Sequence, residues 1–142
     1  MIYLDSSVLL ELYLGQPRAD EARALLAAPL PLVSSWLLAV EVPVVLRRAL
    51  SARPVDAPLL AAALARFDAD VEAVSLFSDT AGVARRVRAD ARLAHCRTLD
   101  AIHAASALLL QEMAGTSVSF ATFDRRLGDV AARLPLGLAL TP

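Results

Sequence analysis

Ile2-Tyr3-Leu4-Asp5-Ser6-Ser7 is the stretch that decides the fold, because it joins a short apolar run to an acidic residue and two hydroxyls. The apolar run, with a β-branched member, predicts a buried strand over residues 2–4. Ser6 and Ser7 predict a serine-capped helix that continues to Leu14. A strand that leads directly into a helix is the repeating unit of α/β proteins.

The rest of the chain repeats this alternation of short strands and helices. Pro43 is expected to kink one helix, because proline removes the hydrogen bond to Ala39. The alternation predicts a parallel sheet with helices on both faces and a ligand crevice at the carboxyl ends of the strands. No linker or repeat divides the sequence, so residues 1–142 are predicted to form one domain. The pattern predicts further strands at 32–33, 71–74, 117–122 and 136–140, and helices at 17–28, 36–50, 56–67, 78–94, 98–115 and 123–132.

Composition excludes several classes of function. The 14 Lys+Arg and 15 Asp+Glu give a net charge of −1, so bulk positive charge cannot attract nucleic acid. Every basic residue is an arginine, which excludes a P-loop lysine and a Schiff-base lysine. The single Cys96 cannot form an intrachain disulfide, and no Cys/His cluster has zinc-ligand spacing.

The mean hydropathy of +0.54 raises the question of a membrane span. The longest uncharged stretch, residues 24–40, contains two prolines and two serines, which favours two elements joined by a turn. The first residues lack the pattern of a secretory signal peptide. We therefore expect a cytoplasmic protein with no membrane partner.

Four acidic residues stand where chemistry is expected. Asp5 and Asp124 follow predicted strands, so both would face the crevice. Glu41 is the one charge in the apolar stretch 37–46, and Asp100 precedes an apolar helix. Each has an alternative structural explanation, such as a turn, a helix cap, a first helical turn or an ion pair with a nearby arginine.

Convergence of the four carboxylates would have a large electrostatic cost. At separations of about 5 Å and an effective dielectric constant of about 20, their repulsion sums to roughly 20 kcal/mol. This exceeds the ~5–15 kcal/mol by which a domain is stable, so convergence requires cations. Oxygen ligands without Cys or paired His suit Mg²⁺ or Mn²⁺, and such ions activate water and neutralise charge in phosphoryl chemistry.

Four segments of the chain carry recognisable motifs: Tyr3-Leu4-Asp5-Ser6-Ser7, Ser35 through Val40-Glu41-Val42, Thr98-Leu99-Asp100-Ala101-Ile102-His103-Ala104-Ala105 and Thr122-Phe123-Asp124-Arg125-Arg126-Leu127. In order and spacing they resemble the motifs of PIN-domain ribonucleases, most closely the VapC toxins of bacterial and archaeal toxin–antitoxin modules. The resemblance spans nearly the whole chain. It implies a three-layer α/β/α PIN-like fold around a central, mostly parallel five-stranded sheet. It also implies Mg²⁺- or Mn²⁺-dependent endonucleolytic cleavage of RNA, a small VapB-type antitoxin that blocks the site, and a homodimer.

The resemblance also implies roles for individual residues. Ser7 matches a hydroxyl position beside the first Asp, and Thr122 matches the polar residue ahead of the last. The chain departs from the family at Glu11, where many relatives have Lys, and at Pro43, where relatives usually continue the helix smoothly. The catalytic and metal-binding acidic positions are matched by Asp5, Glu41, Asp100 and Asp124.

Other features of the sequence have two interpretations each. The densest basic segment could contact RNA phosphates or form a solvated helix face. His103 is expected to be a packed, hydrogen-bonded histidine in preference to a metal ligand, since no second His joins it. Residues 58–64, with the helix after Trp36, form either ordinary core or an apolar groove for the antitoxin and a second protomer. The arginines at helical spacing in the basic segment are Arg85, Arg88 and Arg92.

Two alternatives to the ribonuclease remain at this point. One is a catalytically silent PIN-like module that binds RNA or protein, with Glu41 displaced by Pro43. The other is a phosphohydrolase of the haloacid dehalogenase type, which also uses an Asp after the first strand. That class needs a second Asp two residues later, where this chain has Ser7, so we rank it last.

Overall fold

The sheet has five parallel strands in the order β3-β2-β1-β4-β5, in a computed structural model that describes residues 1–50 and 57–140. This confirms the predicted α/β class. The order places the first strand at the centre, between β2 and β4. The strands are β1 (Ile2–Leu4), β2 (Leu32–Ser35), β3 (Val74–Phe77), β4 (Ser119–Ala121) and β5 (Gly137–Leu140).

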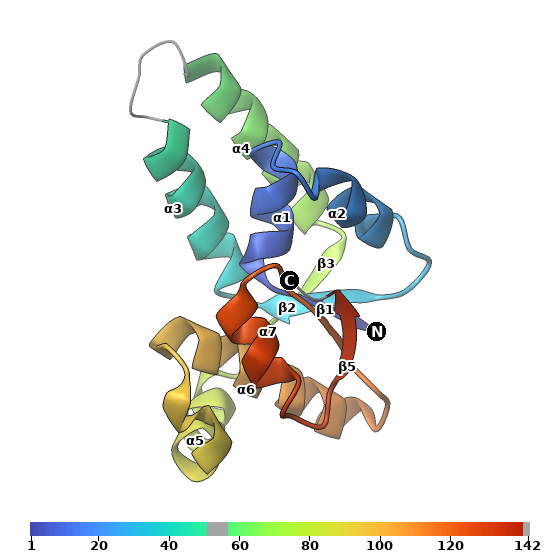
Figure 1. Cartoon of the computed structure of the whole chain (residues 1–142), viewed down its shortest axis with the longest axis vertical. Helices are drawn as coiled ribbons and strands as arrows, with labels where there is room; N and C mark the ends of the chain where they lie inside the picture. The colour runs from blue at the N-terminus through green and yellow to red at the C-terminus, as the bar shows by residue number, and fades with distance from the viewer. Residues whose placement is uncertain (51–56, 141–142) are drawn as a thin grey trace.

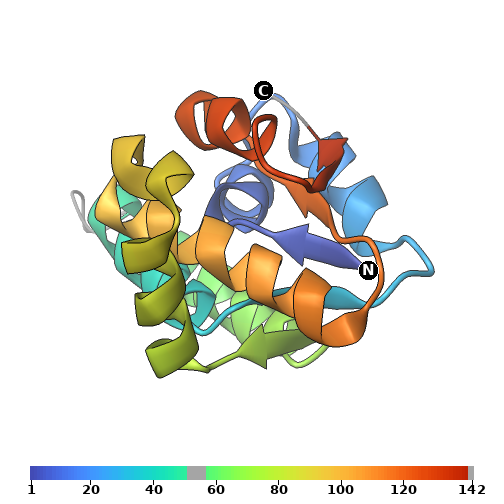
Figure 2. The same ribbon diagram turned by 90° about the horizontal axis from the view of Figure 1, so that it is seen from below.

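Helices cover both faces of this sheet, as Figures 1 and 2 show from two directions. In β1, Ile2 and Leu4 pack into the core under the first four helices, while Tyr3 between them packs on the other face. Alternate side chains of a strand point to opposite faces, so a strand buried on both sides is apolar throughout. The helices are α1 (Ser6–Tyr13), α2 (Ala19–Leu26), α3 (Leu38–Leu50), α4 (Ala57–Val71), α5 (Thr80–Ala89), α6 (Thr98–Ala114) and α7 (Arg125–Ala131), with a short 3₁₀ helix η2 (Ala91–His95).

Two strand and helix boundaries differ from the prediction on the β3 side of the sheet. The predicted strand at 71–74 begins instead at Val74, because α4 continues to Val71. Phe67 is buried in the core and Val71 packs against the same cluster, so packing extends the helix past its predicted end. The predicted start of this helix at Asp56 lies outside the described residues.

Aspartates, not serines, cap the helices after β1 and β3. Asp5 caps α1 by accepting from the Ser7 backbone N–H, and Asp79 caps α5 by accepting from Gly82. The predicted helix over 78–94 therefore starts later, and it ends at Ala89. Asp90 accepts from the backbone N–H of Arg92 and starts η2. Arg92 thus stands outside the helix that carries Arg85 and Arg88, and the predicted continuous stripe is broken.

Helix α3 runs without interruption through Pro43. Its first turn follows β2, where Ser35 Oγ accepts from the backbone N–H of Leu37. Helix α6 ends as predicted near Gly115, which has a left-handed φ of 60° that favours glycine. Within the described residues no helix is long and apolar enough to cross a membrane.

Candidate active site

The four acidic residues singled out in the sequence line one pocket of about 290 Å³. Asp5 and Asp124 follow β1 and β4, which are neighbours in the parallel sheet, so their carboxyl ends lie at one edge. Glu41 is in the first turn of α3 and Asp100 in the first turn of α6. Four helix N-termini therefore surround the pocket, and their partial positive charge favours carboxylates there.

Asp5 is held rigidly on one of its oxygens. Its Oδ2 accepts from Ser7 Oγ at 2.5 Å and from Thr122 Oγ1 at 2.9 Å. Both hydroxyls accept a backbone N–H, from Phe123 and Asp124 respectively, so their own hydrogens are available to Asp5. In the described residues, Asp5 Oδ1 receives no hydrogen bond. The carboxylate is thus oriented with one oxygen left over for a ligand.

Glu41 is held in the same way, and it points into the pocket despite Pro43. Its Oε2 accepts from Ser6 Oγ at 2.5 Å and contacts His103 Nε2 at 2.7 Å. Burial raises the pKa of Glu41, but the hydrogen bonds from His103 and Ser6 outweigh burial and leave the pKa below its ordinary value. Glu41 is therefore ionised at neutral pH. Its partner is His103, not the nearby arginines that the sequence suggested.

The other two acids differ from each other in their hydrogen bonds. Asp124 caps α7, and its Oδ1 accepts from the backbone N–H groups of Arg126 and Leu127. The Asp100 carboxylate receives no hydrogen bond from the described residues. Burial raises the pKa of Asp100, and the charges of Asp124 and Asp5 raise it further. The pocket thus has an excess of negative charge that a cation would relieve.

The donor set fits a hard divalent cation, although it does not enclose one. Among the described residues, no three His, Cys, Asp or Glu side chains are close enough together to hold a metal ion. Mg²⁺ does not need such a cage, because it keeps several waters and binds through one or two carboxylates plus substrate phosphates. Each of Asp5, Glu41 and Asp124 has one oxygen held by protein donors and one without such a bond in the described part of the chain. These free oxygens and Asp100 are the groups that would hold the ion.

Sequence reasoning missed several residues of this site. Ser6 bonds to Glu41, Tyr3 bonds to His103, and Arg48 lines the pocket. His103 is packed and hydrogen-bonded, as expected, and is only 1% exposed. Burial lowers the pKa of His103, but the Glu41 hydrogen bond and the charge of Asp5 outweigh burial and raise it above the ordinary value. Ser6 and Tyr3 belong to the first motif, and that membership is the signal that could have pointed to them.

The structure does not bring the predicted RNA-contacting arginines into this pocket. Arg85 lines a separate surface hollow with Asp79 and Gly82. Arg88 lines another, together with Trp36, Thr98 and Ile102. Arg92 forms an ion pair with Asp90 at 2.6 Å. Arg88 thus shares a hollow with the first turn of α6, where Asp100 stands.

The family model described as PIN domain matches residues 2–133. A search of curated proteins finds no match.

Proposed function

The chain belongs to the PIN-domain family, whose members are typically metal-dependent nucleases, and from this premise we propose that it is a Mg²⁺- or Mn²⁺-dependent endoribonuclease. In this proposal the protein is a VapC-like toxin that hydrolyses RNA phosphodiester bonds and is neutralised by a VapB-type antitoxin. The observation that carries the proposal is the meeting of four carboxylates, distant in sequence, in one pocket at the carboxyl edge of the sheet.

The acidic residues at the pocket, two hydroxyls and one arginine each have a part in this reaction. Asp5 and Asp100 would form the centre of the metal site, and Glu41 and Asp124 would complete it. When bound, the ion would supply an activated water and neutralise charge on the scissile phosphate. Ser7 and Thr122 hold Asp5 in place. The Arg48 guanidinium, on the wall of the same pocket, suits a phosphate oxygen of the substrate.

Asp5→Asn is the sharpest test of the proposal. The Asn carbonyl can still accept from Ser7 and Thr122, but its NH₂ group replaces Oδ1 and repels a cation. We expect RNA cleavage, measured over a Mg²⁺ and a Mn²⁺ titration, to fall more than about 100-fold, since changes outside the ligand shell already cost 10–100-fold. The matched control is Asp68→Asn on the exposed face of α4, which should cleave like wild type. Metal-independent cleavage that survives in Asp5→Asn would contradict the proposal.

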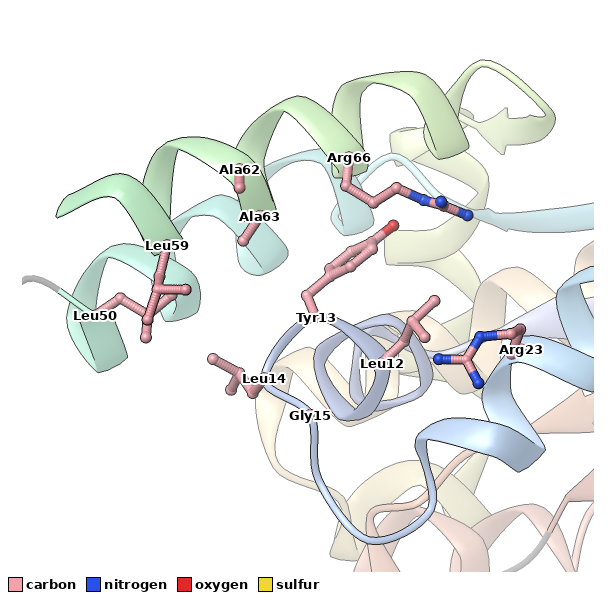
Figure 3. Close-up of a pocket in the computed structure, with 10 residues that line it drawn as sticks. All are labelled: Leu12, Tyr13, Leu14, Gly15, Arg23, Leu50, Leu59, Ala62, Ala63 and Arg66. Carbon is pink, nitrogen blue, oxygen red and sulfur yellow. The ribbon is translucent and has the colours of Figure 1, made fainter. Parts of the chain in front are cut away.

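A groove between the C-terminal end of α1 and helices α3 and α4 supports the antitoxin part of the proposal (Figure 3). It has a volume of about 480 Å³. Leu59, 60% exposed, stands on its α4 wall, within the segment predicted to contact partners. Leu59→Glu should retain RNA cleavage yet escape neutralisation by the antitoxin, measured as growth on co-expression. Growth restored equally for wild type and variant would count against this groove.

The second candidate function is a catalytically silent module that binds RNA or protein. It is favoured by the absence, within the described residues, of three side chains already placed to hold a metal ion. Growth on expression separates the two candidates. The toxin inhibits growth and Asp100→Ala relieves the inhibition, whereas the silent module gives the same growth with either chain.

A further inference from the structure

A chain of three hydrogen bonds connects the backbone of β2 to Glu41. The Ser35 N–H donates to Tyr3 Oη at 3.0 Å, Tyr3 Oη lies 2.9 Å from His103 Nδ1, and His103 Nε2 lies 2.7 Å from Glu41 Oε2. Tyr3 is fully buried and His103 nearly so. The chain therefore crosses the interior from the sheet to the acidic pocket, through β1, α6 and α3.

The two ends of this series of hydrogen bonds set its direction. The Ser35 backbone N–H can only donate, so Tyr3 Oη accepts from it, and an ionised Glu41 carboxylate can only accept, so His103 Nε2 donates to it. On a neutral imidazole Nδ1 is then the acceptor, and the Tyr3 hydroxyl donates to it across 2.9 Å. A neutral His103 then carries its proton on Nε2, the nitrogen that faces Glu41.

Packing fixes the rings that carry this chain. The Tyr3 ring stacks on Phe120 with centroids 5.0 Å apart and planes 11° apart. The His103 ring meets the Tyr3 ring edge-on, with centroids 5.9 Å apart. His103 Nε2 also lies 3.8 Å from Asp5 Oδ1, so the imidazole stands between two of the four acids. Both ring nitrogens therefore already have protein partners, and neither is available to bind a metal ion.

We propose that His103 is a positioning residue: its Nε2–H holds Glu41 Oε2 so that Oε1 stays turned to the metal pocket, and Tyr3 selects the imidazole tautomer that can do this. This inference rests on the proposed function, because it assigns His103 a role towards the metal ion. Ser6 Oγ donates to the same Glu41 oxygen, and the His103 ring, 1% exposed and packed in the core, adds the second donor.

The test measures the dissociation constant for Mn²⁺, by electron paramagnetic resonance of the free ion, and the Mn²⁺ concentration that gives half-maximal RNA cleavage. We expect His103→Leu to raise both values about 10–100-fold. His103→Gln, whose amide N–H can replace Nε2–H, should restore both to within a few-fold of wild type. His95→Gln, at the chain's other histidine, is exposed and serves as the matched control. In a cycle with Glu41→Gln, His103→Leu should add little, because both act on one ligand.

A second measurement does not depend on the folding of His103→Leu. The ¹⁵N chemical shifts of the His103 ring in the metal-free wild type, above the pKa of the ring, should report an unprotonated Nδ1 and a protonated Nε2. Tyr3→Phe should change this tautomer ratio and weaken Mn²⁺ binding in parallel. A ring protonated on Nδ1 in the wild type overturns the proposal.

The outcomes separate the two proposals. If wild type cleaves RNA with Mn²⁺ and His103→Leu binds Mn²⁺ equally well, the positioning role is overturned and the ribonuclease stands. If wild type does not cleave RNA but His103→Leu and Tyr3→Phe weaken Mn²⁺ binding as expected, the ribonuclease fails and the positioning of the metal ligand stands.

Discussion

Asp100 is the one acid of the pocket whose carboxylate receives no hydrogen bond from the described residues, and its pKa is shifted in the direction opposite to that of Glu41. Asp5, Glu41 and Asp124 are each held by donors on one oxygen, whereas burial and the charges of two neighbours oppose the ionised form of Asp100. The folded, metal-free protein therefore carries an unfavourable charge at this position at neutral pH. Asp100, which the proposed function requires, therefore reduces the free energy of unfolding of the metal-free protein.

Asp100→Asn should consequently lose RNA cleavage and gain stability. The raised pKa means that the wild-type residue contributes stability below its ordinary pKa of 3.8 and loses that contribution as the pH rises through the higher folded value. At pH 7 the variant should unfold at a higher urea concentration, by up to about 1 kcal/mol because solvent screens the half-exposed group. The difference should shrink as the pH falls towards 4, with EDTA present throughout. A variant less stable than wild type at pH 7 would contradict this.

Among the elements, α3 is the clearest conflict between local preference and tertiary structure. Pro43 leaves the Ala39 carbonyl without its usual helical partner, yet the helix continues and Glu41 is held in the pocket by Ser6 and His103. The kink that we predicted at Pro43 rests on helix propensity alone. The contacts that hold α3 in place come from residues that are remote in sequence, and propensity does not describe them.

Pro43→Ala should restore the missing N–H and stabilise the protein by about 1–3 kcal/mol, the helical cost of proline less its benefit in the unfolded chain. Cleavage should stay within about two-fold of wild type, since Glu41 is already positioned. Urea unfolding and a standard cleavage assay check the two parts. If Pro43→Ala instead raises cleavage strongly, then proline does disturb the Glu41 ligand in solution.

Helix α5 and η2 divide the basic segment that looked continuous in the sequence. Asp90 follows the last residue of α5, accepts from the backbone N–H of Arg92 and pairs with its guanidinium. This explains why the helical spacing of the arginines does not extend to Arg92. Arg85 and Arg88 remain on α5, and Arg88 lies in a hollow beside the first turn of α6. An RNA strand that passes over this hollow would reach Asp100.

The double variant Arg85→Gln/Arg88→Gln should therefore bind RNA more weakly. The slope of log affinity against log salt concentration should fall by about 1.4, or about 0.7 for each lost phosphate contact on a single strand. Fluorescence anisotropy at four salt concentrations measures the slope. Arg133→Gln, exposed beyond α7, is the matched control. An unchanged slope in the double variant would assign these arginines to a solvated helix face.

At the scale of the whole molecule, the parallel sheet and the edge where the acids meet could be reasoned from the sequence, but the strand order and the hydrogen bonds at the site could not. Asp5 and Asp124 follow strands, and strand ends are visible in a pattern of apolar residues. The contact of Tyr3 with His103 joins residues 100 apart, and it depends on side-chain directions that no local pattern contains. The net charge of −1 also conceals a strong local charge, because four of the 15 acidic residues gather in one pocket.

An apolar patch at the mouth of that pocket leads us to expect a homodimer. Val40 and Val44, one turn apart on α3, are 47% and 46% exposed, and Leu99 on α6 is 46% exposed. Val44 and Leu99 both line the acidic pocket, so the patch adjoins it. Light scattering at micromolar concentration should give the mass of a dimer for wild type and of a monomer for Val40→Ser/Val44→Ser. A monomeric wild type would exclude the patch as a dimer interface.

The central place of β1 has a consequence for how a ribosome makes this protein. Asp5 emerges among the first residues, but Thr122, which orients it, is 117 residues later, and β4 must pair with β1 before the two can meet. At about 5–20 residues per second, roughly 6–23 s of synthesis separate them. A chain still being translated therefore has Asp5 but neither Asp124 nor the arrangement that makes these residues a site. If the proposed nuclease activity is correct, a nascent copy cannot cleave the RNA around it. An antitoxin made during that interval would be present before the site forms.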